Sequence, residues 1–252
     1  MSFAFLQAKI ERRRCVPRME LMNNRLISLV FICIAGVVSV DNVCAQAPVA
    51  GEDYVVIRDG QPFKASEDKI VVEEVFNYGL PGCYQAQSQF SAWAAKLPSD
   101  VEVAYLPLPI AYSVPKHRLV GEYVVAPGSD PYERAFYAAQ SYDLIDEAHE
   151  ELYEAIHKSN SLPAIPGPAP DKERLAAFFS AYGVDAQQFL KKLSSFGVEA
   201  KIQRAKKMRR VFKAPSIIVN GRYAILPHSE RTYADMLATA SYLVDKERER
   251  LE

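Results

Sequence analysis

Cys83 is the residue of this 252-residue chain that is best placed to do chemistry. An apolar, β-rich run ends at Phe76, a turn follows at Gly79, and a pattern typical of an amphipathic helix begins near Cys83. A strand, a short Gly/Pro turn and a helix with a cysteine in its first turn form a layout that is typical of a thiol redox site. The position therefore predicts thiol chemistry, provided that the surrounding elements leave the thiol reactive.

The N-terminus has the composition of a signal peptide. An apolar run of about fifteen residues, from Leu26 to Val40, follows a basic cluster and precedes the small residues Val43-Cys44-Ala45. This run is short for a membrane-spanning helix, so an uncleaved anchor is the second alternative. We predict that residues 1–45 are a signal peptide and that the mature chain is exported.

Cleavage after Ala45 would leave Cys83 as the single cysteine of the mature chain. The mature chain would carry 24 Lys and Arg against 28 Asp and Glu, a net charge of −4. A lone cysteine cannot form an internal disulfide, so Cys83 is a buried inert thiol, a reactive monothiol or an intermolecular partner. The basic run 201–210 is interpreted as a solvated helix face, and no nucleic-acid partner is expected.

The histidines show no metal-ligand spacing, and we expect them to be ordinary surface residues. They are His117, His149, His157 and His228. Neither a metal nor a cofactor is predicted.

Hydrophobic periodicity predicts a β-β-α-β order in the first half of the mature chain. Strands are expected at 54–57, 70–76 and 101–108, with a helix from about Cys83 to before Pro98. A strand, helix, strand unit requires a right-handed crossover and parallel pairing of the two strands.

A helical middle segment precedes a second β region. The expected elements are helices at 131–158, 171–182 and 185 towards 210, with an extended proline-rich loop at 161–170. Asn220-Gly221 between two apolar strands predicts a tight hairpin, because both turn positions need positive φ. Ser229 is expected to cap a final helix.

Two motifs in this order, and the helical insertion between them, resemble the DsbA-type thiol–disulfide oxidoreductases. From Glu74 to Tyr84, the sequence Glu-Val-Phe-Asn-Tyr-Gly-Leu-Pro-Gly-Cys-Tyr is similar to the strand and C-P-x-C-Y site of that family. From Ala214 to Tyr223, Ala-Pro-Ser-Ile-Ile-Val-Asn-Gly-Arg-Tyr resembles its cis-proline strand and hairpin. The resemblance implies an α/β protein with a thioredoxin-like fold, an inserted all-helical domain and a periplasmic location.

The resemblance also implies domain limits. After the signal peptide, the thioredoxin-like domain would occupy residues 46–127 and 211–252. The inserted helical domain would occupy residues 128–210.

The family roles can be transferred residue by residue. Cys83 matches the second cysteine of the family, which resolves the mixed disulfide. Glu74 matches the buried acid that accepts a proton, and Pro215 matches the cis-proline. The positions expected to contact substrate are Leu80, Pro81, Gly82, Tyr84 and Ala214. For Glu74, the alternative is a partly solvated carboxylate at a strand end. Tyr78, Tyr84 and Leu80 could form an apolar rim around the site or be used up in core packing.

The departure from the family motif is at Leu80, which stands where the attacking cysteine is expected. The intramolecular dithiol cycle would then be impossible, and burial beside Glu74 would leave Cys83 a sluggish thiol. One hypothesis is a thiol:disulfide interchange protein with lost or reduced activity, acting on unfolded or reduced exported polypeptides with a membrane oxidant protein as a further partner. The alternative is a redox-inactive, peptide-binding chaperone or assembly factor.

Overall fold

The computed structural model describes most of the chain beyond the N-terminal segment. The described residues are 47–64, 66, 68–108, 111–116, 120–125, 130–163, 170–208 and 213–251. The predicted signal peptide, most of the proline-rich loop and His117 lie outside these residues. No helix in the described ranges has both the length and the hydropathy that a membrane span requires.

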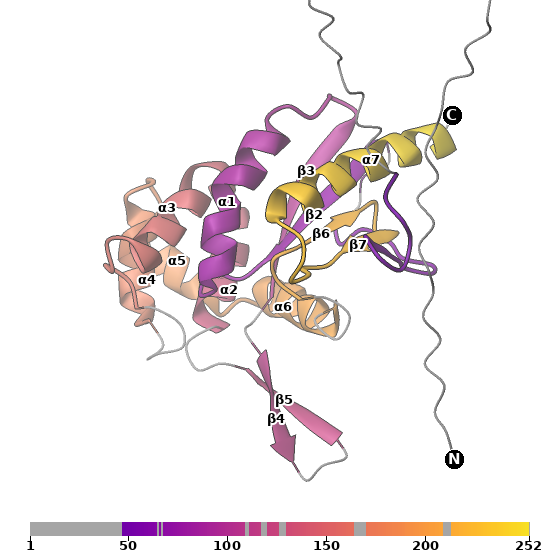
Figure 1. The fold of residues 1–252 in the computed structure, drawn as a ribbon. Helices are drawn as coiled ribbons and strands as arrows, with labels where there is room; N and C mark the ends of the chain where they lie inside the picture. Colours follow the sequence, from indigo (N-terminus) through magenta and orange to yellow (C-terminus); the bar gives the residue numbers. More distant parts are fainter. Residues whose placement is uncertain are drawn as a thin grey trace, which may run out of the picture. The chain divides into compact units, whose positions relative to one another are not determined.

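A mixed sheet with the strand order β1-β7-β6-β2-β3 forms the centre of the structure (Figure 1). The strands are β1 (Val55–Val56), β2 (Ile70–Phe76), β3 (Val101–Pro107), β6 (Ser216–Val219) and β7 (Tyr223–Ile225). Strand β2 pairs with β3 in parallel, as predicted, and with β6 in antiparallel fashion. Every residue of β2 is buried, which explains its nearly continuous apolar sequence.

Helices α1 (Pro81–Ala94) and α7 (Tyr233–Leu251) pack against one face of the sheet (Figure 1). Phe90 of α1 and Leu243 of α7 are fully buried there together with Val72 of β2. Burial of one such side chain contributes about 1.5–3 kcal/mol, so this apolar layer fixes α1 firmly above β2.

A run of helices between β5 (Val120–Val125) and β6 confirms the predicted α/β order with a helical insertion. They are α2 (Asp130–Gln140), α3 (Ile145–His157), α4 (Lys172–Ser180), α5 (Ala186–Leu193) and α6 (Phe196–Met208). Asp171 caps α4 through a hydrogen bond from the Glu173 N–H, as its position predicts. The domain limits proposed at 127/128 and 210/211 fall outside the described residues and stay predictions.

Two of the predicted long helices were wrong because each is broken by a short turn. The helix expected at 131–158 is interrupted at 141–144, where Asp143 takes a positive φ of 57° and Leu144 N–H donates to the Ala139 carbonyl. This bonding pattern is typical of a helix that ends at a residue with left-handed backbone conformation. The helix expected from 185 breaks at Ser194, and the Ser195 hydroxyl accepts a hydrogen bond from Val198 N–H at the start of α6. The helices on both sides of each break bury apolar faces in the same core, so the helical spacing of apolar residues continues across the break.

The final helix starts later than predicted. Thr232, not Ser229, caps α7: its hydroxyl accepts from Asp235 N–H at 3.2 Å, and the Asp235 carboxylate accepts from Thr232 N–H at 2.8 Å. This reciprocal pair satisfies two helix-end donors, which Ser229 does not.

The hairpin prediction at Asn220-Gly221 is confirmed, with φ values of 49° and 65°. A second hairpin, β4 (Ala111–Lys116) with β5 (Val120–Val125), was missed by the sequence analysis.

Candidate functional site

Two segments far apart in sequence meet at the carboxyl end of β2. The β2–β6 register pairs Val75 with Ser216, which places Pro215 beside the end of β2. The Ala214–Pro215 peptide bond is cis, as predicted from the resemblance. A Cβ atom at Gly82 would lie 3.9 Å from Cδ of Pro215, an ordinary contact distance. The start of α1 and the cis-proline therefore form one continuous surface.

The start of α1 is unusual because a hydrophobic residue occupies its cap position. Leu80 has an extended backbone and makes no side-chain capping bond, and Pro81 is the first helical residue. Proline is favoured there because its missing N–H would have no intrahelical partner. Leu80 is half-buried against the core, whereas Pro81 and Gly82 are exposed. An accessible apolar surface therefore surrounds the helix start.

The thiol of Cys83 lies below that surface and is fully buried. Burial raises the pKa of Cys83 to about 12; the hydrogen bond to the Asn77 backbone lowers it by less than burial raises it, and the nearby Glu74 adds a smaller upward contribution. The direction of this shift agrees with the expectation that burial makes Cys83 a sluggish thiol. At neutral pH the thiol is protonated.

Glu74 is fully buried on the same side of β2, which excludes a partly solvated strand-end carboxylate. The Tyr233 hydroxyl donates to Glu74 Oε1 at 3.1 Å, and Oε2 has no hydrogen-bond partner among the described residues. Burial raises the pKa of Glu74 to about 8, although the hydrogen bond from Tyr233 acts in the opposite direction. Sequence analysis missed Tyr233, since its 159-residue separation from Glu74 leaves no local signal.

His149 is buried, so the prediction that it is a surface histidine was wrong. Tyr78 hydroxyl bonds to His149 Nδ1 at 2.8 Å, and His149 Nε2 lies 3.1 Å from the Gln87 side-chain carbonyl. Because an amide oxygen only accepts, Nε2 carries the proton and Nδ1 accepts from Tyr78. Burial lowers the pKa of His149 to about 3, so the ring is neutral. Its position on the apolar face of α3 is the signal that could have identified it.

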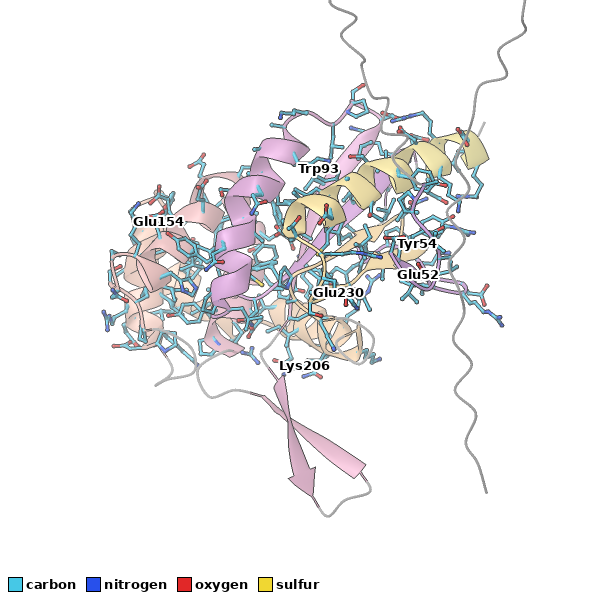
Figure 2. The ribbon with its side chains drawn as sticks, viewed as in Figure 1. Glu52, Tyr54, Trp93, Glu154, Lys206 and Glu230 are labelled. Atoms are coloured by element: carbon cyan, nitrogen blue, oxygen red, sulfur yellow. The ribbon has the colours of Figure 1, made fainter. Side chains whose placement is uncertain are left out.

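Tyr84 is turned towards α3 and lies at the margin of the site. Its ring stacks on His157 at a centroid distance of 4.9 Å. Its hydroxyl donates to Oε1 of Glu154 at 3.3 Å; Glu154 belongs to α3 and is labelled in Figure 2. His157 Nε2 in turn donates to the Tyr78 carbonyl at 2.6 Å. Tyr78 is buried and belongs to the core, so only Leu80 and Tyr84 of the three proposed rim residues are partly exposed.

Further buried polar residues escaped the sequence analysis. Asn77 Oδ1 accepts from Gly79 N–H at 2.7 Å and shapes the turn before α1, a local bond that its spacing from Gly79 could have indicated. The Tyr153 hydroxyl is buried without a hydrogen-bond partner among the described residues, near Cys83 and Glu74. Within those residues, no group of three or more His, Cys, Asp and Glu side chains is arranged to hold a metal ion.

Comparison with known proteins agrees with this geometry. The family model of the DSBA-like thioredoxin domain matches residues 71–238. The thiol:disulfide interchange protein DsbA of Pseudomonas aeruginosa is 30% identical over 226 residues, covering 88% of this chain and 97% of that protein. DsbA of Azotobacter vinelandii is 31% identical over 201 residues, covering 79% of this chain and 84% of that protein.

Solved structures give the same result. The crystal structure of the oxidoreductase DsbA from Xylella fastidiosa superposes with a TM-score of 0.66 at 33% identity, covering 80% of this chain and 98% of that one. Pseudomonas aeruginosa DsbA superposes with a TM-score of 0.64 at 29% identity, covering 81% and 96% of the two chains. The predicted thioredoxin-like α/β fold is confirmed, and the chain belongs to the DSBA-like thioredoxin domain family of thiol:disulfide interchange proteins.

Proposed function

We propose that this protein is an exported, periplasmic member of its family that binds extended polypeptides beside Pro215 and has lost most or all dithiol oxidase activity. The observation that carries the proposal is the burial of Cys83, the single cysteine after position 45, beneath Leu80. The predicted signal peptide supports export. The relatives are named for thiol:disulfide interchange, which supports exported polypeptides as the substrates.

The missing nucleophile limits the chemistry. In dithiol oxidation, a substrate thiolate attacks the first sulfur of the protein's own disulfide, a mixed disulfide forms, and the second sulfur leaves as thiolate. A second substrate thiolate then attacks the mixed disulfide, which leaves the substrate oxidised and the protein reduced. Leu80 offers no sulfur for the first step, and Cys83 alone cannot form the starting disulfide. A membrane oxidant, expected from the resemblance, would find no dithiol to reoxidise.

The state of Cys83 adds a kinetic barrier. With a pKa of about 12, only about 10⁻⁵ of the thiol is ionised at pH 7, against a few per cent for an exposed cysteine. Since the thiolate is the reacting form, exchange through Cys83 would be roughly a thousandfold or more slower before any steric effect is counted.

The binding surface supports a peptide ligand. Pro215 has no N–H and lies beside the exposed Gly82, while Ala214, Pro215 and Leu80 are each half-buried. An extended peptide could therefore lie across this strand edge with apolar contacts, as in strand-addition recognition. Within this proposal, Leu80 serves as an apolar contact in place of a nucleophile.

A monothiol exchange protein is the second candidate. It is favoured by Glu74, because a buried carboxyl group with a pKa of about 8 and an unpartnered oxygen can exchange a proton near neutral pH beside Cys83. The Cys83 thiolate would attack one sulfur of a small disulfide, such as oxidised glutathione, or of a substrate disulfide; a mixed disulfide forms and the other sulfur leaves as a thiolate.

The test compares wild type with Cys83→Ala in insulin-reduction and peptide-oxidation assays, with aggregation suppression measured alongside. We expect negligible redox rates for both proteins and equal suppression of aggregation. A measurable rate that disappears in Cys83→Ala would refute the redox-inactive function and establish the monothiol alternative.

Leu80→Cys tests the scaffold itself. We expect it to gain oxidase activity, since it restores the first sulfur of the motif. The matched control Leu80→Ala removes the same apolar side chain without adding a sulfur, and should weaken peptide binding without any gain of redox activity. A peptide affinity unchanged in Leu80→Ala would contradict the proposed role of Leu80.

A further inference from the structure

A polar pocket of about 530 Å³ lies at the opposite end of β2 from Cys83. It is lined by residues of the segment before β2, of the Asn220-Gly221 hairpin turn and of the C-terminal end of α7. Its volume is in the range of small-molecule sites. Since β2 is seven residues long, the pocket is roughly 20 Å from the thiol, so it is separate from the site described above.

The pocket walls are predominantly cationic. Lys69, Arg222 and Arg250 line it, against a single lining carboxylate, Asp68, among the described residues. Gln61, Ser66 and Asn220 add neutral hydrogen-bonding groups. A wall of this composition favours a polar ligand with negative charge over an apolar one.

A buried carboxylate holds the two arginines in place. Glu247 is fully buried and accepts from Arg250 Nε and Nη2 at 3.0 and 2.9 Å, while Arg222 Nε lies 3.5 Å from Glu247 Oε1. Asn220 Nδ2 donates to the same carboxylate at 2.8 Å. Burial raises the pKa of Glu247, but the hydrogen bonds from Arg250 and Asn220 outweigh it and keep the pKa below its ordinary value. Glu247 is therefore ionised and orients both guanidinium groups.

Both arginines retain unused donors. Each has 43% of its side chain exposed. Arg250 Nη1 makes no hydrogen bond to any described residue, and Arg222 uses its Nε atom on the Glu247 side, where that atom is buried 3.5 Å from the carboxylate. Planar guanidinium groups match the geometry of carboxylate and phosphate oxygens, and prior orientation lowers the entropy cost of binding.

The rim of the pocket is rigid. A Cβ atom at Gly221 would lie 2.2 Å from the Gln61 carbonyl carbon, and one at Gly60 would lie 2.0 Å from the Gly221 oxygen. The hairpin turn and the segment before β2 therefore touch backbone to backbone, which leaves no room for the pocket to collapse on that side.

We propose that this pocket binds a small polar anion through a phosphate or carboxylate group held by Arg222, Arg250 and Lys69. The ligand class is a phosphorylated or carboxylated metabolite, or the phosphate headgroup of an anionic lipid, because these share the oxyanion that the wall recognises. The proposal does not depend on the chemistry of Cys83.

Inorganic phosphate is the probe, titrated into ¹⁵N-labelled protein at constant ionic strength and followed by amide chemical shifts. We expect saturable shifts at residues 60–69, 220–222 and the end of α7. The double variant Lys69→Gln/Arg222→Gln should weaken binding at least tenfold, and Lys69→Gln alone, at an exposed position, should weaken it severalfold without affecting folding.

The matched control is Lys96→Gln/Lys172→Gln, which lowers the net charge equally at two exposed lysines outside the pocket. It should bind phosphate like wild type. Linear, unsaturable shifts in wild type, or equal weakening in the control, would overturn the proposal. Co-sedimentation with phosphatidylglycerol vesicles that the pocket variant abolishes would identify a lipid headgroup; saturable phosphate binding without co-sedimentation would identify a soluble anion.

Discussion

Glu74 and Glu247 are both fully buried, yet their carboxyl groups have pKa values shifted in opposite directions. Glu74 has one neutral donor, the Tyr233 hydroxyl, and burial raises its pKa to about 8. Burial raises the pKa of Glu247, but the hydrogen bonds from Arg250 and Asn220 and the positive charge of Arg250 together outweigh it. Burial alone therefore does not decide whether a carboxyl group is charged; the charge of its partners does.

The different ionisation of the two carboxyl groups matches different proposed functions at the two ends of β2. The Glu74 end of β2 surrounds Cys83 with neutral groups and an apolar surface. The Glu247 end is ionised and holds cations at a polar pocket. In the proposed functions, the first region binds polypeptide and the second binds an anion.

The largest expected effect comes from removing the ionised carboxylate. Glu247→Ala should lower the free energy of unfolding by about 2–4 kcal/mol, because Asn220 and the inward-facing donors of Arg250 and Arg222 lose their partner. Urea denaturation at pH 7 measures it. Glu249→Ala, at an exposed position two residues away on the same helix, should change stability by less than about 0.5 kcal/mol. Equal effects of the two variants on stability would contradict the conclusion that Glu247 is an ionised carboxylate paired with these donors.

The next largest effect is on the pH dependence of stability: Glu74 should make the protein less stable as the pH rises, whereas Glu247 acts in the opposite direction. Its pKa is raised from 4.5 to about 8 on folding, so the unfolded chain loses its proton first as pH rises from 4.5. The contribution of Glu74 to stability is complete below pH 4.5 and is lost as the pH rises towards 8. Glu74→Gln should therefore be more stable than wild type at pH 7 by about 1–3 kcal/mol and nearly equal to it at pH 4.

Urea denaturation of both proteins between pH 4 and 8 checks this. A stability difference that does not grow with pH would show that Glu74 is ionised in the folded protein. The Glu247 carboxyl, whose pKa is lowered on folding, acts in the other direction: its contribution is present above its unfolded value and is lost as the pH falls through the folded one.

The smallest expected effect comes from removing the Tyr233 hydroxyl, the neutral donor to Glu74. Tyr233→Phe removes the hydrogen bond that lowers the pKa of Glu74, so that pKa should rise further and stability should fall by about 0.5–1.5 kcal/mol at pH 7. Carbon-13 shifts of the Glu74 carboxyl group report its titration. Tyr242→Phe, on the same helix and without a hydrogen bond to Glu74, serves as the control. A titration unchanged in Tyr233→Phe would mean that burial alone sets this pKa.

Local signals were sufficient for most of the elements that build the site. The run from Lys69 to Phe76 and the turn at Gly79 indicated β2 and the start of α1, and Asn220-Gly221 indicated the hairpin that carries the cis-proline strand. Each signal lies within a few neighbouring residues, where backbone preference and side-chain periodicity dominate.

Helix boundaries were less predictable. The breaks at Asp143 and Ser194 interrupt helices whose apolar residues continue on both sides, and the choice of Thr232 over Ser229 depends on Asp235 three residues later. Periodicity reports which residues face a core, but capping bonds decide where a helix stops.

The sequence by itself determined the fold class, the helical insertion and the presence of one thiol at the start of α1. Only the tertiary structure decided the state of that thiol, the burial of His149 and the opposite ionisation of Glu74 and Glu247. Those properties depend on groups that folding brings together over long separations, such as Tyr233 with Glu74 and Asn220 with Glu247. Desolvation and partner charge exist only after folding, so no pattern along the chain encodes them directly.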